Sequence, residues 1–171
     1  SSPTIPEYAF NGTIVGNNDC WHSKSGNFSS GIAQWLSFEF PTEKYITKYK
    51  IWSRNHSDNL QPNSWQLLGI HDSQINSISD FSYNIDSSYN IIDTRSGQTS
   101  WVRPTGGTSD ITNDTKRNEY YVANPGYYKY YVLHITSSGH SSHVAISELA
   151  YYANDYPYGG ANIYTLNSDD T

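Results

Sequence analysis

The sequence predicts an all-β protein: one antiparallel β-sandwich of about eight strands, with long loops at one end. Short runs of β-branched and aromatic residues, bounded by Ser, Asn, Gly and Pro, recur along the chain, whereas helical periodicity is almost absent. Three of the connections are long, spanning residues 16–34, 55–63 and 94–118. Long loops in a compact domain are usually either functional or disordered, and we expect the binding residues there.

The clearest strand covers residues 35–40, in which Leu36, Phe38 and Phe40 share one face. We expect Pro41 to end it, because proline cannot donate to a strand ladder. The next strand covers 45–54, and a hairpin of the two would bring Trp35 and Arg54 to one end of the sandwich. Further strands are expected at 64–71, 89–93, 119–123, 128–136 and 144–152, and strand 128–136 would deliver residues 137–143 to that same end.

Composition excludes several classes of protein. The 171 residues carry a formal net charge of −6 with only 10 Lys and Arg, which argues against nucleic-acid binding. No apolar run approaches the ~18–20 residues of a membrane span. Only 15% of the residues are charged, so solubility must come from Ser, Thr and Asn. Such a surface is common outside the cell, and we expect a secreted, cell-surface or virion-surface domain. The chain begins at Ser1 without a signal peptide, as a processed product or excised domain would.

Residues 8–153 are expected to form the sandwich, between an N-terminal linker at 1–7 and a Tyr- and Gly-rich tail or linker at 154–171. Cys20 is the only cysteine, which excludes an internal disulfide, and it is expected to be a small buried residue.

Seven short motifs follow one another in a characteristic order. They are Ala9-Phe10-Asn11-Gly12, Cys20-Trp21-His22-Ser23, Trp35-Leu36-Ser37-Phe38-Glu39-Phe40, Ile51-Trp52-Ser53-Arg54, Pro62-Asn63-Ser64-Trp65-Gln66-Leu67 with Gly69-Ile70-His71-Asp72, Tyr130-Tyr131-Val132-Leu133, and Ile146-Ser147-Glu148-Leu149. Over residues 8–152 the chain thereby resembles the discoidin family, also called the coagulation-factor V/VIII type C domain, which includes the family 32 carbohydrate-binding modules. The stretch 93–101 is similar to versions on bacterial surface proteins and phage tail fibres. The resemblance implies an eight-stranded jelly roll that binds ligands at its loop tips.

Sugar recognition needs an aromatic face to stack on a pyranose ring and planar groups that bind vicinal hydroxyls. The candidates at the loop end are Trp21, His22, Arg54, Asn55, His56, Asp58, Asn59, Trp101 and His140. Two of them have a structural alternative: Trp21 matches a motif position that packs against the sandwich, and Arg54 suits a buried ion pair or a hydrogen-bonded strut below the loop. Trp101 lies in a loop with no obvious core to join, where an exposed ring would stack on a sugar.

The resemblance also implies a structural calcium ion, since many relatives hold Ca²⁺ with an early Asp and a late Glu. The matching residues here are Asn11 and Glu148, with Thr13 as a further contributor. Asn11 in place of Asp removes one charge from the site and should weaken binding. The alternative is a hydrogen-bond network in which Glu148 joins the two ends of the chain. His140 and His143 lack a third well-spaced ligand, so a zinc site is not expected.

No enzyme motif is present in the sequence, and only five Glu accompany Asp residues that lie mostly in turns. We therefore expect a non-catalytic, lectin-like module that binds a glycan on a cell surface or polysaccharide. The alternative is an assembly or adhesion module that binds sister copies or its parent polypeptide. The pairs Tyr127-Tyr128, Tyr130-Tyr131 and Tyr151-Tyr152 favour that alternative, because Tyr is enriched in interfaces.

Overall fold

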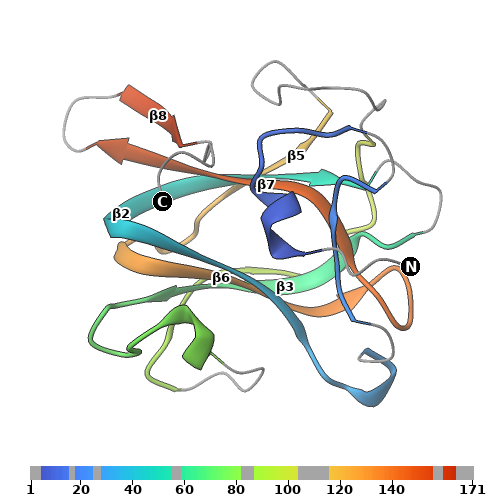
Figure 1. Ribbon diagram of the computed structural model, residues 1–171, viewed down its shortest axis with the longest axis horizontal. Helices are drawn as coiled ribbons and strands as arrows, with labels where there is room; N and C mark the ends of the chain where they lie inside the picture. Colours follow the sequence, from blue (N-terminus) through green and yellow to red (C-terminus); the bar gives the residue numbers. More distant parts are fainter. Residues whose placement is uncertain are drawn as a thin grey trace.

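The computed structural model describes residues 5–15, 18–24, 28–54, 59–81, 87–103, 116–155 and 160–164. The strands are β1 (Trp21–His22), β2 (Gln34–Ser53), β3 (Pro62–Ile70), β4 (Asn90–Arg95), β5 (Asn118–Tyr121), β6 (Tyr127–Ser138), β7 (Ala145–Asp155) and β8 (Gly160–Tyr164). Three short 3-10 turns accompany them: η1 (Pro6–Ala9), η2 (Phe28–Ser30) and η3 (Ile78–Asp80). The expected all-β sandwich is confirmed (Figure 1).

Two antiparallel sheets face each other and share β2. The first half of β2 pairs with β6, which continues to β3 and β4, and we name this the lower sheet. The second half of β2 lies between β7 and β5 in the upper sheet, and β7 also pairs with β1 and β8. Figure 1 shows β2 running to one end of the molecule, bending there and returning in the other sheet.

The expected hairpin of residues 35–40 and 45–54 is therefore wrong, because the two segments form one strand whose halves lie in different sheets. The register shows where the strand bends. Between Glu39 and Lys44 it advances five residues while its partner advances two, from Tyr130 to Tyr128. Pro41 lies inside this irregularity, so it marks the bend and does not end the strand.

The main core fills the space between the sheets. Alternate residues of β2, such as Leu36 in its first half and Ile51 in its second, meet Leu67 and Leu133 there. A smaller cluster covers the outer face of the lower sheet, where Phe81 packs near the η3 turn. Two of the Tyr pairs are consequently buried on both faces of their strands: Tyr130 and Tyr131 of β6, and Tyr151 and Tyr152 of β7.

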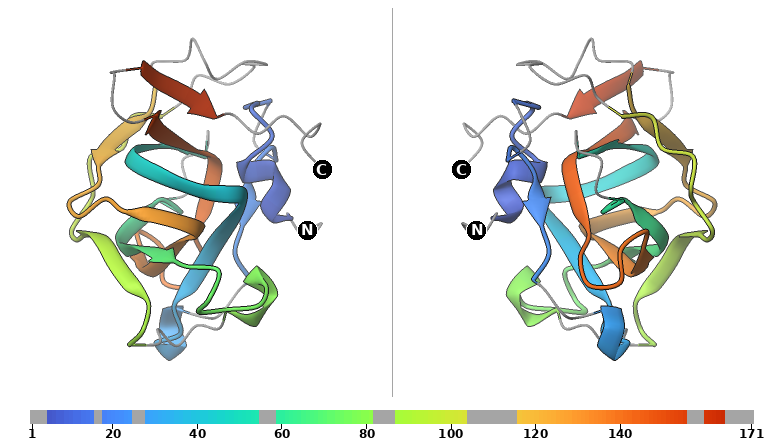
Figure 2. Two further views of the ribbon diagram at one scale, coloured as in Figure 1. Left: turned by 90° about the vertical axis from the view of Figure 1, so that its left-hand side faces the viewer. Right: turned by 90° about the vertical axis from the view of Figure 1, so that its right-hand side faces the viewer.

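The C-terminal range expected to be a tail or linker contains β8, which pairs antiparallel with the end of β7 (Figure 2). Cys20 is buried beside Leu60 and Ala145, as expected. None of the helical segments in the described ranges is long and apolar enough to cross a membrane.

Candidate functional site

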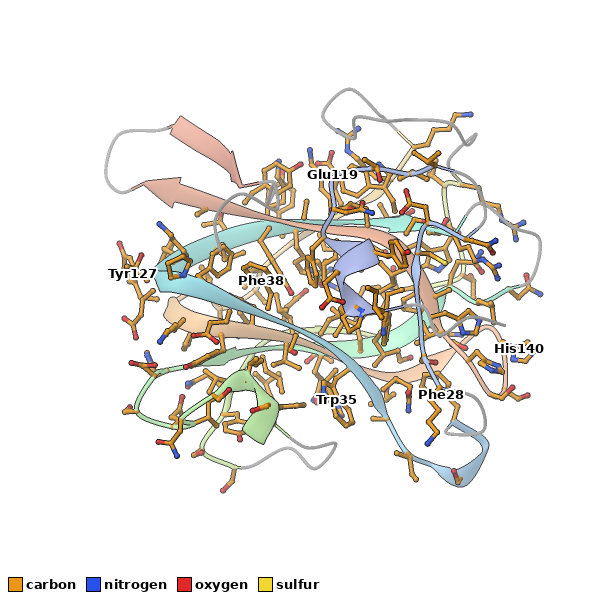
Figure 3. All side chains as sticks on the ribbon, viewed as in Figure 1. Phe28, Trp35, Phe38, Glu119, Tyr127 and His140 are labelled. Atoms are coloured by element: carbon orange, nitrogen blue, oxygen red, sulfur yellow. The ribbon has the colours of Figure 1, made fainter. Side chains whose placement is uncertain are left out.

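Both ends of β2 lie at the same end of the sandwich, and we name this end the loop end. Gln34 at the start of β2 is opposite Ile135, near the end of β6. Ser53 at the end of β2 is opposite Ile146, at the start of β7. The expectation that Trp35, Arg54 and the residues after 136 lie at one end is therefore confirmed, although a bend in β2 and not a hairpin brings the two ends of this strand together. The side chain of His140 marks this end in Figure 3, with Tyr127 at the opposite end.

His22 is placed at the loop end by strand pairing. It lies opposite Ala145 in the β1–β7 ladder. The next residue, Ser23, extends that ladder, because its N–H donates to the Val144 carbonyl and its hydroxyl accepts from the Val144 N–H, both at 2.9 Å. These two hydrogen bonds between Ser23 and Val144 hold the imidazole of His22 next to the loop between β6 and β7.

The loop between β6 and β7 is organised by two serine side chains. Ser138 Oγ accepts from the His140 N–H at 3.0 Å and lies within 2.6 Å of the carbonyl oxygens of His140 and His143. Ser142 Oγ lies 3.1 Å from His140 Nδ1 and 3.0 Å from His143 Nδ1. These contacts fix both imidazoles relative to the loop backbone.

Three imidazole rings thus form a row along the loop end. The ring centroids of His22 and His143 are 4.8 Å apart, and those of His143 and His140 are 5.6 Å apart. Burial, together with the neighbouring His22 and His140, lowers the pKa of His143. His143 therefore stays neutral at pH values where an ordinary histidine begins to be protonated.

The hydrogen bonds give the Nδ1 atoms of the outer two rings opposite roles. His22 Nδ1 lies 3.0 Å from the Ser23 carbonyl, which only accepts, so this nitrogen donates. His140 Nδ1 accepts from the Ser142 N–H at 3.2 Å, so its proton is on Nε2. His140 therefore presents a donor nitrogen away from the loop backbone.

A second segment, residues 59–61, interlocks with this loop. Gly139 donates to the Gln61 carbonyl at 3.0 Å, and Ala145 donates to the Leu60 carbonyl at 2.8 Å. A Cβ on Gly139 would lie 2.5 Å from the Asn59 carbonyl oxygen, so only glycine fits there. Asn59 itself is exposed with a φ of 50°, a left-handed conformation that Asn tolerates better than most residues.

The remaining predicted residues are distributed more widely. Trp21 is 6% exposed and packs in the main core, the structural alternative considered for it. Trp101 also reaches that core, because its ring lies 6.1 Å from Trp65 and its Nε1 donates to the Pro62 carbonyl at 3.1 Å. Arg54 is half-buried directly after β2. Asn55, His56 and Asp58 fall outside the described residues.

A second cluster joins the N-terminal segment to β7. Asp19 accepts from the Asn11 side chain at 2.8 Å and from the Thr13 hydroxyl at 2.8 Å. Glu148 is 2% exposed and accepts from the Gly12 N–H at 3.2 Å. Burial, reinforced by the nearby Asp19 charge, raises the pKa of Glu148 to about 9. Asn11, Thr13 and Glu148 therefore do come together, and Asp19 joins them.

Sequence reasoning missed two of these residues. Asp19 is one of the Asp residues that the sequence places in turns, although it follows Asn11 and Thr13 closely enough to suggest a shared loop. From the sequence alone, His143 stands out only as a metal-ligand candidate beside His140, because its contact with His22 depends on the β1–β7 register. In the part of the chain that the structure describes, no group of three or more His, Cys, Asp or Glu residues is arranged to hold a metal.

Comparison of the sequence with protein-family models finds no match, and neither does comparison with curated proteins. Solved structures do match. The F5/8 type C domain of a Bacteroides fragilis protein has a TM-score of 0.60 at 8% identity, covering 90% of this chain and 83% of that one. The family 32 carbohydrate-binding module of C. perfringens NanJ, in complex with galactose, has a TM-score of 0.56 at 14% identity, covering 88% and 86%.

Chitosan-binding module 1 of a chitosanase/glucanase from Paenibacillus sp. IK-5 has a TM-score of 0.55 at 15% identity, covering 90% of this chain and 88% of that one. At such low identities the likeness establishes the fold, and it agrees with the order of the seven sequence motifs. The chain therefore has the discoidin-like β-sandwich fold shared by F5/8 type C domains and family 32 carbohydrate-binding modules.

Proposed function

We propose that this domain is a non-catalytic carbohydrate-binding module that works outside the cell and recognises a glycan at its loop end. The observation that carries the proposal is the row of His22, His143 and His140, presented by β1 and the β6–β7 loop. The fold supports it, since similar structures include a module in complex with galactose and a chitosan-binding module.

The chemistry of the row suits a sugar. Each hydroxyl of a sugar both donates and accepts, so an imidazole nitrogen in either role can bind it. His140 Nε2 supplies a donor, since its Nδ1 accepts from the Ser142 N–H, and the His143 and His22 rings extend the site beside it. Asn59, exposed beside Gly139, adds an amide on the adjoining segment.

A glycan array on the whole chain, followed by calorimetry with the best ligand, tests this function. His140→Ala and His143→Ala should each weaken binding by roughly tenfold or more, as expected for central contacts of a small site. His71→Ala is the matched control, because His71 follows β3 at the opposite end of the sandwich and pairs with Glu43. Absence of any glycan signal, with concentration-dependent oligomers, would favour the assembly alternative instead.

We further propose that the Asn11–Thr13–Asp19–Glu148 cluster holds a calcium ion. All of its donors are oxygens, which Ca²⁺ prefers. Glu148 and Asp19 are two acidic groups close enough to raise the pKa of Glu148, and a cation between them would stabilise the charged form of both. Asp19 supplies the carboxylate that Asn11 lacks. Such an ion would tie the N-terminal segment to β7.

Thermal unfolding tests the ion separately from glycan binding. Millimolar Ca²⁺ should raise the melting temperature of EDTA-treated protein, because a ligand that binds only the folded state stabilises it. Glu148→Gln should abolish that rise, whereas Glu39→Gln, on the exposed surface of the lower sheet, should leave it intact. A melting temperature that is indifferent to Ca²⁺ would leave Glu148 as part of a hydrogen-bond network only.

A further inference from the structure

The outer face of the upper sheet carries a cationic cluster that the loop end does not use. Lys48 and Lys50 of β2 point away from the main core, because the intervening Tyr49 points into it. Lys48 lies between Tyr121 of β5 and Tyr152 of β7 in the strand register. Figure 3 shows Glu119, the neighbour of both lysines, on the same upper sheet and away from His140.

The carboxylate of Glu119 is shared unequally among three cations. Arg117 binds its Oε1 closely, with Nη2 at 2.7 Å and Nε at 3.0 Å. The ammonium groups of Lys50 and Lys48 lie 3.5 and 3.9 Å from the carboxylate, beyond the ~2.7–2.9 Å of a strong charge-assisted hydrogen bond. Burial, together with the charge of Arg117, lowers the pKa of Lys50. Another anion beside the lysines would therefore be stabilised.

Aromatic rings lie beside both lysines. The buried Tyr152 ring lies 4.2 Å from Lys50 Nζ and 4.7 Å from Lys48 Nζ, measured to the ring centroid. Tyr121 is 70% exposed, and Lys48 Nζ lies 5.9 Å from its ring centroid. The exposed Tyr121 ring offers a face for stacking, and Lys48 offers a positive charge near enough for the same ligand to contact both.

We propose that Lys48 and Tyr121 form a second binding site, with the buried Lys50 beside them adding positive charge, and that this site takes an acidic polysaccharide whose sugar rings carry carboxylates. Charge complementarity is local, because the whole chain has a net charge of −6 and would otherwise repel a polyanion. A carboxylate is favoured because the cluster already binds the carboxylate of Glu119. The exposed Tyr121 ring favours a sugar, since it stacks on a pyranose.

The experiment measures binding of an oligogalacturonate to the whole chain by calorimetry at low and at physiological salt. Its methyl ester is the matched ligand, with the same rings and no charge. The acid should bind and the ester should not, and affinity should fall as salt rises. Lys48→Gln should weaken binding by roughly fivefold, the upper range for a partly exposed ion pair.

Three further variants sharpen the result. Tyr121→Ala should weaken binding with little effect on folding, because the side chain is largely exposed. Glu119→Gln should strengthen binding, because it removes the carboxylate that competes for both lysines. Lys129→Gln is the control, since Lys129 pairs with Asp72 and Glu39 of the lower-sheet region.

The outcomes separate this site from the loop end. His143→Ala should leave oligogalacturonate binding unchanged, and Lys48→Gln should leave the neutral glycan of the loop end unchanged. Equal binding of the methyl ester, or loss of binding with His143→Ala, would overturn the proposal. Equally tight binding of dextran sulfate or poly-glutamate would reduce the site to a general polyanion surface and would overturn its assignment to uronates. Weaker binding by Glu119→Gln would contradict the proposed competition.

Discussion

The hydroxyl of Tyr49 donates a 2.7 Å hydrogen bond to the carboxylate of Asp93, across the interior from the upper sheet to the lower. Asp93 is 3% exposed and also accepts from Arg95 Nε at 2.8 Å, while Trp65 Nε1 donates to the Tyr49 hydroxyl at 2.9 Å. Burial and the Asp93 charge raise the pKa of Tyr49 far above its ordinary value. The phenol therefore stays protonated, and remains a donor, at pH values where an ordinary tyrosine begins to ionise.

Tyr49→Phe should reduce the free energy of unfolding by about 1–3 kcal/mol, because it leaves two buried polar partners without the hydroxyl they share. Urea unfolding followed by tryptophan fluorescence measures the change. Tyr127→Phe, at a half-exposed ring, is the matched control and should have almost no effect. Equal stabilities of the two variants would show that the hydroxyl of Tyr49 contributes nothing net.

Glu148 makes the metal-free protein sensitive to alkaline pH. Its folded pKa of about 9 lies above its ordinary value of 4.5, so the folded state keeps a proton that the unfolded chain releases. The stability due to this proton is complete below the ordinary value and is lost as pH rises towards about 9. Urea unfolding in EDTA at about pH 6 and about pH 8.5 should show the loss.

Glu148→Gln should remove this dependence, since the amide does not titrate. Calcium should also remove it in the unmodified chain, because it binds the deprotonated carboxylate. If the stability of Glu148→Gln depends on pH as steeply as that of the unmodified chain, groups other than Glu148 cause the dependence.

His143 makes the opposite contribution at acid pH. Its pKa is lowered in the fold, so below its ordinary value of 6.5 the unfolded chain takes up a proton that the folded state resists. Stability is therefore present above that value and is lost as pH falls below it. The groups that face His143 are His22, His140 and the Ser142 hydroxyl. His143→Phe keeps a ring but removes the titrating group, so the free energy of unfolding of this variant should fall less steeply below the ordinary histidine pKa. An unchanged fall would show that His143 is not its cause.

Gly139→Ala should disturb the loop end without touching an imidazole. The new Cβ would meet the Asn59 carbonyl at 2.5 Å, so residues 59–61 and the β6–β7 loop must separate. We expect a loss of about 1–3 kcal/mol in the free energy of unfolding, as for other overpacked sites, together with weaker glycan binding. Ser141→Ala, in the same loop and exposed, is the control. Unchanged affinity in Gly139→Ala would show that the glycan does not depend on this packing.

Local sequence patterns predicted the strands well. The alternation of Leu36, Phe38 and Phe40 placed the first half of β2, and period-two patterning placed most of the others within two or three residues of their observed ends. Such patterns depend only on neighbouring residues, which is why they can be recognised in one sequence. They do not show that a strand continues through Pro41 into a second sheet, because that depends on partners at 128–130 and 151–153.

The candidate site was predicted in part for the same reason. His22 and His140 could be assigned to the loop end from strand direction, whereas the contact between His22 and His143 requires the exact β1–β7 register. Trp101 looked like an isolated loop aromatic, yet its ring packs beside Trp65, which lies 36 positions earlier. Long-range packing of this kind leaves no periodic trace in a sequence.

The bent course of β2 has a consequence for how the domain unfolds. A strand that supplies hydrogen bonds to both sheets covalently joins them through the middle of the fold. Neither sheet can then detach while the other keeps its ladder intact, so the two layers should unravel as one cooperative unit. Amide hydrogens of Leu36 and Ile51, on opposite sides of the bend, should exchange with solvent at similarly slow rates set by global unfolding.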